Sequence, residues 1–278
     1  MSEAAGADQA IDVPSISVVT PSFNQAGYLE RTLRSVLDQG YERLEYLVLD
    51  GGSTDGSAQI LESYGPRLAY WVSERDNGQS AAINSGWRRS SGDILGWINS
   101  DDYYLPGALQ FVGDYFARHP ETAFVYGRCE VVDADGVRRG LIGHQYHRAG
   151  MLNGIQPMPQ PSTFIRRSLF EAAGPIDESL QYAMDFDFFL RAAGHAVPVF
   201  IDRPLAAFTV HQGAKTSAGR ARSRQETFEV ALRYARGWER LGVRARAFRA
   251  QLFHALPASL KRWIDLRRDS PVTLTWER

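Results

Sequence analysis

The sequence predicts an α/β fold built on a doubly wound, mostly parallel sheet that is flanked by helices. Short apolar runs rich in β-branched residues alternate with stretches of helical periodicity, which is the pattern of parallel strands joined by crossover helices. Polar residues also follow these runs at their carboxyl ends, at Asn24, Asp50, Asp76 and Asp101. Because open α/β sheets bind ligands at this edge, we expect a polar crevice there.

Length and composition restrict the class of protein. The chain has 278 residues, of which 44% are hydrophobic and 23% charged, as in ordinary globular proteins. A formal net charge of −1 gives no electrostatic case for a nucleic-acid partner. The single Cys129 excludes an internal disulfide and a multi-cysteine zinc site. Without a signal peptide or an apolar stretch of about 20 residues, the expected location is the cytoplasm.

The first half of the chain is expected to alternate between strands and helices after a short leader. Residues 1–14 are small, polar and without periodicity, which predicts a disordered leader. The expected strands cover 15–20, 44–49, 68–73 and 93–98. The expected helices lie at about 26–39, 57–64, 79–90 and 106–118.

The pattern changes after about residue 120. Expected strands cover 123–126, 128–132, 137–142, 162–166, 197–201 and 205–210, with helices at about 168–173 and 185–193. A turn at 133–136 joins two of these strands as a hairpin. Residues 143–160 are rich in His, Gly and Pro and predict a long loop. The segment from Gln160 to Thr163 is expected to line one side of the crevice.

The C-terminal region from 212 to 278 is expected to be a flexible loop followed by basic helices. Residues 212–223 are polar, and helices are expected at about 223–241, 243–255 and 258–267. Arginines outnumber acids in this region. One interpretation is a pair of helices that docks on a membrane surface or a partner. The alternative, which we favour, is amphipathic packing on the core with a solvated arginine face.

The acidic turn Asn99-Ser100-Asp101-Asp102 follows an apolar strand and precedes a helix. Adjacent carboxylates raise one another's pKa unless a cation neutralises them. Mg²⁺ takes oxygen ligands and commonly joins carboxylates to substrate phosphates. The turn therefore indicates either a divalent-metal site or an ordinary strand-end turn, since Asn, Ser and Asp all favour turns.

Five motifs together resemble the inverting family-2 glycosyltransferases with the GT-A fold. They are Val19-Thr-Pro-Ser-Phe-Asn24, Asp50-Gly-Gly-Ser-Thr-Asp-Gly56, Asp76-Asn-Gly78, Asn99-Ser-Asp-Asp102 and Met184-Asp-Phe-Asp187. Each motif alone is weak, but their order and spacing are specific. The resemblance covers about 15–211 and implies a nucleotide-binding half at 15–120 and an acceptor-binding half at 121–211.

The resemblance also implies roles for the matched residues. Those in nucleotide-contacting loops are Pro21, Phe23, Asn24, Asp50, Arg75 and Asp76. Asn99, Ser100 and Asp101 match the DXD element, which contacts the donor. Asp101, Asn99 and His211 are the implied ligands of Mn²⁺ or Mg²⁺. Asp185 matches the catalytic base, with Asp187 as the alternative.

The implied reaction moves a sugar from a nucleotide diphosphate sugar, with UDP favoured, to a hydroxyl of a carbohydrate or lipid-linked glycan. Such relatives usually build surface polysaccharides or glycoconjugates, so peripheral contact with the cytoplasmic membrane face is a further expectation. A divalent cation stabilises charge on the departing diphosphate, and one carboxylate must take the acceptor proton. Asp185 opens a helix, which favours its ionised form, and Phe186, Phe188 and Phe189 are expected to surround it. Asp185 could instead be an ordinary N-cap.

Several departures from the family pattern leave alternatives open. Gly51 stands where many relatives carry a carboxylate that contacts the nucleobase. Met184 replaces an acid that is common directly before the catalytic base. Asn99 is neutral, so weaker metal binding is expected. One alternative is a catalytically weak GT-A module that binds carbohydrate or nucleotide. Another is a sugar nucleotidylyltransferase, although the loop after the first strand lacks the glycine- and basic-rich sequence that such an enzyme needs.

Overall fold

The computed structural model describes residues 13–211 and 219–255. Most of the expected leader, the segment directly after His211 and the helix expected at 258–267 lie outside these residues. Val13 and Pro14, which we expected in the disordered leader, are instead held in place. Their carbonyls accept hydrogen bonds from Arg43 and Tyr41 respectively.

A single mixed sheet organises the described residues. Its nine strands are β1 (Ile16–Ser22), β2 (Leu44–Asp50), β3 (Tyr70–Ser73), β4 (Ile94–Trp97), β5 (Tyr103–Tyr104), β6 (Phe124–Asp133), β7 (Arg138–Ile142), β8 (Thr163–Arg166) and β9 (Val199–Val210). The order is β3-β2-β1-β4-β8-β6-β9-β5, with β7 on β6. Strands β1 to β4 pair in parallel, whereas β8 is antiparallel to both β4 and β6. The predicted doubly wound, mixed sheet is therefore confirmed.

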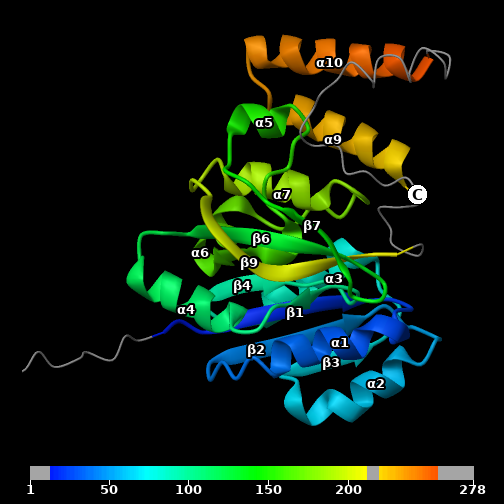
Figure 1. The fold of residues 1–278 in the computed structure, drawn as a ribbon, viewed down its shortest axis with the longest axis vertical. Helices are drawn as coiled ribbons and strands as arrows, with labels where there is room; N and C mark the ends of the chain where they lie inside the picture. The colour runs from blue at the N-terminus through cyan, green and yellow to red at the C-terminus, as the bar shows by residue number, and fades with distance from the viewer. Residues whose placement is uncertain (1–12, 212–218, 256–278) are drawn as a thin grey trace, which may run out of the picture.

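Helices cover both faces of this sheet (Figure 1). They are α1 (Ala26–Leu37), α2 (Ser57–Tyr64), α3 (Gln79–Arg89), α4 (Ala108–Arg118), α5 (Arg148–Leu152), α6 (Arg167–Ala173), α7 (Met184–Ala192), α9 (Arg220–Tyr234) and α10 (Trp238–Ala255). Because successive strand side chains point to opposite faces, neighbours in β1 enter different cores. Val18 packs with α1 and α4, and Val19 packs with α3 and α7.

Two pairs of predicted strands are each one continuous strand, so the predicted breaks are wrong. Strand β6 spans both 123–126 and 128–132, and β9 spans both 197–201 and 205–210. The pairing of β6 with β9 shifts register at Gly127 and Arg128, so a bulge absorbs the irregular residues. A Cβ on Gly127 would lie 2.6 Å from the Leu205 side chain, so this close approach requires glycine.

Three further local predictions were incomplete. The loop expected at 143–160 contains α5, whose Met151 and Leu152 are buried in the core. The short strand β5 was not predicted. The break between the C-terminal helices falls at 235–237 rather than near 242, and Gly237 there has a φ of +47°.

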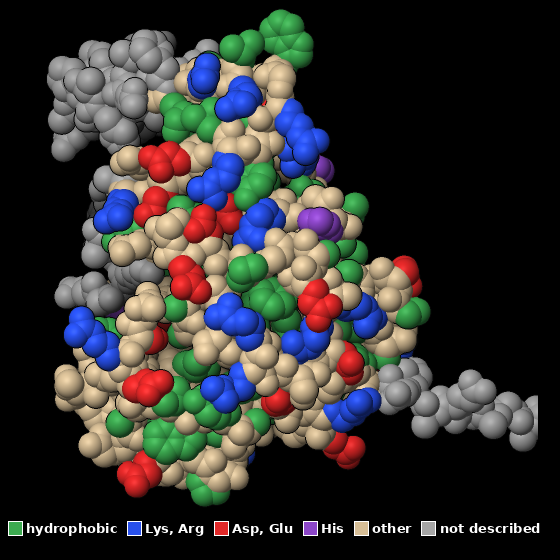
Figure 2. All heavy atoms as spheres, turned by 180° about the vertical axis from the view of Figure 1, so that it is seen from behind, with side chains coloured by type: hydrophobic (Ala, Val, Ile, Leu, Met, Phe, Trp, Pro, Cys, Tyr) green, Lys and Arg blue, Asp and Glu red, His purple; other side chains and the backbone are tan. Residues whose placement is uncertain are grey.

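The C-terminal helices lie at one end of the molecule, beyond α7 (Figure 1). Helix α9 buries Val230 and Ala231 in the same core as α7, which confirms that it packs on the core. Helix α10 buries Val243 in this core as well, but it leaves Trp238 86% exposed and Leu241 55% exposed. Hydrophobic side chains accordingly protrude at the upper end of the molecule (Figure 2). None of the helices within the described residues is both long and apolar enough to cross a bilayer.

Candidate active site

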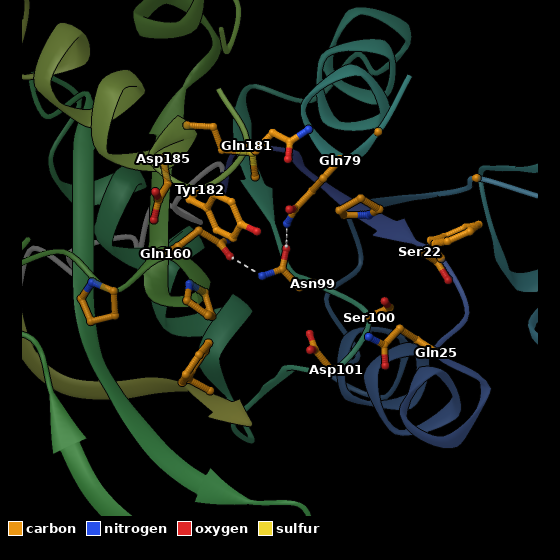
Figure 3. A pocket seen from close by; sticks show the side chains of 18 of the residues that line it. Ser22, Gln25, Gln79, Asn99, Ser100, Asp101, Gln160, Gln181, Tyr182 and Asp185 are labelled. Carbon is orange, nitrogen blue, oxygen red and sulfur yellow. Dashed lines mark hydrogen bonds between the residues drawn. The ribbon is translucent and has the colours of Figure 1, made fainter. Parts of the chain in front are cut away.

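A cavity of about 820 Å³ opens at the carboxyl edge of the sheet, as the strand-end polar residues predicted. The donor side, named for the donor contacts predicted from sequence, is formed by the end of β1, the loop before α3 and the acidic turn after β4. The opposite side is formed by residues 156–161 and by the start of α7. Eight of the predicted site residues line it: Pro21, Phe23, Arg75, Asp76, Asn99, Ser100, Asp101 and Asp185. Figure 3 shows Asp185 and Asp101 on different walls.

Asn24 and Asp50 lie beside the cavity but do not line it. Asp50 is 1% exposed, and its carboxylate accepts hydrogen bonds from Ser53 and Ser73. Asn24 has a φ of +51°, and its side-chain oxygen accepts a hydrogen bond from the Thr54 amide at 3.0 Å. Asn24 therefore ties the loop after β1 to the loop after β2, whereas Asp50 holds the loop after β2 in shape and joins it to β3.

Gly51 and Ser22 are cavity residues on the donor side. A Cβ on Gly51 would lie 3.1 Å from a carboxylate oxygen of Asp76 and 3.3 Å from the ring of Phe23. The glycine thus leaves space between two predicted nucleotide contacts. The buried Ser22 hydroxyl has no hydrogen-bond partner within the described residues. Buried polar groups of this kind require an explanation, and a ligand contact is one. Sequence reasoning missed Ser22.

The acidic turn places its two carboxylates in different environments. Asp101 Oδ2 faces the His211 ring, with Nε2 at 3.0 Å, and the ring centroids of His211 and Tyr28 are 4.5 Å apart. Asp102 is fully buried and accepts the Thr209 amide at 2.9 Å. Burial, together with the charge of Asp101, raises the pKa of the Asp102 carboxyl well above its ordinary value. Asp101 is therefore the carboxylate available to a ligand.

Asp101 and His211 fit a divalent cation that also binds substrate phosphates. They offer one oxygen and one nitrogen donor beside the cavity, and carboxylate and imidazole suit ions such as Mn²⁺. Across the described residues, no group of three or more His, Cys, Asp or Glu side chains is arranged as metal ligands. A cation here would thus complete its coordination with oxygens of the substrate or of water.

Asn99 is the centre of a chain of amides between the two sides of the cavity (Figure 3). Its oxygen accepts from Gln79 at 2.7 Å, and its nitrogen donates to Gln160 at 3.0 Å. Gln160 in turn donates to the Trp97 carbonyl at 2.7 Å. The Asn99 oxygen is thus engaged with Gln79, so Asp101 and His211 are better placed for a metal. Gln160 and Pro161 line the cavity as expected, whereas Ser162 and Thr163 do not.

Asp185 lies in the first turn of α7 and faces the cavity (Figure 3). Its carboxylate accepts hydrogen bonds from the side chain of Gln156 and the amide of Phe186, each at 2.8 Å. The N-cap residue of α7 is Ala183, so the N-cap interpretation of Asp185 is wrong. Gln156, Gln181 and Tyr182 share this wall, and none was identified from sequence.

The other residues of the motif around Asp185 anchor α7 to the body of the protein. Phe188 and Phe189 are fully buried, with ring centroids 5.5 Å from Trp87 and 5.7 Å from Trp97 respectively. They fix the helix in the core and do not line the cavity. Asp187 is also buried and bonded to Arg191, Arg233 and Tyr234. This ion-paired site makes Asp187 a structural residue.

Comparison with known proteins identifies the family. Residues 17–174 match the description "Glycosyl transferase family 2". The chain belongs to this family. This glycosyltransferase is 36% identical over 199 residues to an uncharacterized glycosyltransferase of Mycobacterium tuberculosis, a match that covers 70% of this chain and 75% of the relative. It is 28% identical over 186 residues to the chondroitin synthase of Escherichia coli, covering 64% of this chain and 26% of that protein.

Solved structures confirm the GT-A fold of this glycosyltransferase. S. aureus TarS 1–349 in complex with UDP-GlcNAc has a TM-score of 0.64 at 21% identity, covering 78% of this chain and 64% of that chain. The mannosyltransferase PcManGT from Pyrobaculum calidifontis, in complex with GDP-Man and Mn²⁺, has a TM-score of 0.63 at 18% identity. The match covers 91% of this chain and 80% of that chain. Family membership also excludes the nucleotidylyltransferase alternative.

Proposed function

We propose that this glycosyltransferase moves a sugar from a nucleotide diphosphate sugar to an acceptor hydroxyl, with inversion at the anomeric carbon and with the aid of a divalent cation. The observation that carries the proposal is a single cavity with Asp101, backed by His211, on one wall and Asp185 on another. The first pair suits the diphosphate end of a donor. The second carboxylate suits proton removal from an acceptor.

The donor nucleotide would occupy the half of the cavity formed by residues 15–120. Phe23 is 61% exposed at the cavity, where its ring could stack against a nucleobase. Arg75 is the basic side chain among the described lining residues and suits a phosphate. The complexes of TarS with UDP-GlcNAc and of PcManGT with GDP-Man and Mn²⁺ support a nucleotide sugar and a divalent ion in this fold. We favour UDP and either Mn²⁺ or Mg²⁺.

Asp101 and His211 would hold the cation. Asn99 would stabilise the acidic turn through its hydrogen bonds to Gln79 and Gln160. A bound divalent cation neutralises charge that develops on the departing diphosphate. Ser22, whose buried hydroxyl needs a partner, would bond the nucleoside. Asp50 and Asn24 would shape the loops that hold it.

The acceptor would enter beside residues 121–211 and meet Asp185. The carboxylate takes the proton of the acceptor hydroxyl as that oxygen attacks the anomeric carbon, and the bond to the diphosphate breaks at the opposite face. The hydrogen bond from Gln156 orients one carboxylate oxygen. A single displacement with one base and no covalent intermediate inverts the anomeric centre.

The acceptor is proposed to be a carbohydrate or a lipid-linked glycan in polysaccharide or glycoconjugate synthesis at the cytoplasmic face of a membrane. Exposed Trp238 and Leu241 on α10 lie beside exposed Arg240 and Arg244. Apolar side chains next to cationic ones suit an anionic lipid surface. Peripheral contact through α10 would bring the enzyme to such an acceptor.

The variant Asp185→Asn tests the mechanism, with Asp135→Asn as control because Asp135 is exposed in the hairpin between β6 and β7. UDP, GDP, dTDP and CMP, each with and without Mn²⁺, are first screened for a rise in Tm. Sugar transfer or donor hydrolysis is then measured with the matching nucleotide sugars. We expect Asp185→Asn to keep the Tm shift and to lose at least ~10²-fold in turnover, with Asp135→Asn unchanged. Wild-type turnover in Asp185→Asn would remove Asp185 as the base.

A further inference from the structure

The wall of the cavity that precedes Asp185 is held by a glutamate from α9. The buried side chain of Glu226 places Oε2 within hydrogen-bond distance of three consecutive backbone amides. The distances are 3.0 Å to Gln181, 2.6 Å to Tyr182 and 3.1 Å to Ala183. Gln181 and Tyr182 line the cavity, so the glutamate fixes the backbone of the cavity wall.

The charge of Glu226 suits this position for two reasons. The three amides that it accepts directly precede α7, so no hydrogen bond within the helix can satisfy them. The positive end of the α7 dipole also favours an anion there. A buried carboxylate is costly unless it is fully bonded. The three amides and Arg222, with Nε at 3.4 Å, supply those bonds.

Contacts at both ends of α9 reach the chain around Asp185. A Cβ on Gly219, directly before α9, would lie 2.1 Å from the Tyr182 ring, so the chain packs tightly against this cavity residue. At the other end of α9, Arg233 and Tyr234 bond to Asp187 at 3.1 and 3.0 Å. Helix α9 thus holds the chain on both sides of Asp185, before and after it in sequence.

We propose that Glu226 is a positioning residue of this glycosyltransferase, which fixes Gln181, Tyr182 and the start of α7 so that Asp185 faces the acceptor. The inference rests on the proposed role of Asp185. It makes α9, which lies beyond the family match at 17–174, a part of the active site. Glu226 acts through backbone amides and does not touch the reacting atoms.

The test uses full-length Glu226→Gln and Glu226→Ala. The matched control is Glu229→Gln, because Glu229 is exposed one turn further along α9 and bonds to Gln225 of the same helix at 2.9 Å. Three measurements are made: hydrogen exchange of the 181–183 amides, the nucleotide-induced Tm shift, and the kinetics (kcat and KM) of release of UDP or GDP from nucleotide sugars.

We expect faster exchange at 181–183 and an unchanged nucleotide Tm shift in both Glu226 variants. We also expect kcat to fall by roughly tenfold or more at unchanged donor KM, because small misplacements of a catalytic group are costly. Glu226→Gln should lose less, since its amide keeps one acceptor oxygen. Glu229→Gln should match the wild type in all three measurements.

Wild-type exchange and kcat in Glu226→Ala would overturn the proposal. A fall in kcat that is accompanied by an equal loss of nucleotide binding would also overturn it, because the effect would then be general destabilisation. If the wild type itself released no nucleotide from any donor, the proposed function would fail. Exchange at 181–183 would still decide whether Glu226 holds the wall.

Discussion

Asp187→Asn should destabilise the protein strongly, although Asp187 lies outside the cavity. The Asp187 side chain is 1% exposed. Its Oδ2 accepts a hydrogen bond from Arg191 at 3.0 Å. Its Oδ1 accepts hydrogen bonds from Arg233 at 3.1 Å and from Tyr234 at 3.0 Å. An asparagine has one acceptor oxygen and one NH₂ group. Whichever way the amide is turned, its NH₂ group faces a donor. At least one arginine therefore loses its hydrogen bond to residue 187.

The size of the effect follows from the burial of the partners. Removing one member of a fully buried ion pair costs about 3–5 kcal/mol. Here the Arg233 side chain is 48% exposed and that of Arg191 is 19% exposed, so solvent can satisfy part of the loss. We therefore expect a loss of about 2–3 kcal/mol in the free energy of unfolding. For a chain of this size, that corresponds to a fall in Tm of roughly 5–10 °C.

Urea denaturation followed by tryptophan fluorescence measures the effect, with Asp177→Asn as the control. Asp177 accepts from the same Arg233 at 2.9 Å but is 27% exposed, so its replacement should cost less than about 1 kcal/mol. Equal losses in the two variants, or a loss below 1 kcal/mol for Asp187→Asn, would refute the reasoning that burial sets the cost.

Three other predictions concern the nucleotide, pH and membranes. Phe23→Ala should weaken nucleotide binding at least about fivefold, because base stacking is worth ~1–3 kcal/mol; isothermal titration measures it. Burial raises the pKa of Tyr41 to about 12. The unfolded chain therefore loses this proton first, and stability should fall as pH rises from about 10 to 12, less steeply in Tyr41→Phe. Trp238→Ala with Arg240→Ala should reduce co-sedimentation with anionic vesicles severalfold, and neutral vesicles serve as the control.

A specific result would contradict each of these three predictions. Unchanged nucleotide affinity in Phe23→Ala would place the base elsewhere in the cavity. Identical alkaline stability profiles for the wild type and Tyr41→Phe would show that Tyr41 does not contribute to the pH dependence. Sedimentation that is the same for anionic and neutral vesicles, or for variant and wild type, would contradict membrane contact through α10.

Local sequence determined the first half of the fold. Each strand from β1 to β4 is a short apolar run, and each following helix has its own periodicity, so neighbouring residues suffice to predict them. The same holds for the acidic turn, since Asn, Ser and Asp end a strand through local hydrogen bonds. The strands β6 and β9 were predicted as broken because Gly127 and Pro204 interrupt their patterns. Only their pairing shows that a bulge keeps each strand continuous.

The candidate site likewise has a part that the sequence predicts and a part that only the tertiary structure decides. Motif order made Asp101 and Asp185 the candidates for the metal ligand and the base, and it left Asp187 as the alternative base two positions away. Tertiary structure separates them, because α9 brings Arg233 and Tyr234 to Asp187 from more than 40 residues away. The wall before Asp185 likewise depends on Glu226, which is 45 residues from Gln181. Buried polar groups must find partners wherever packing places them, and spacing along the chain does not reveal which partners those are.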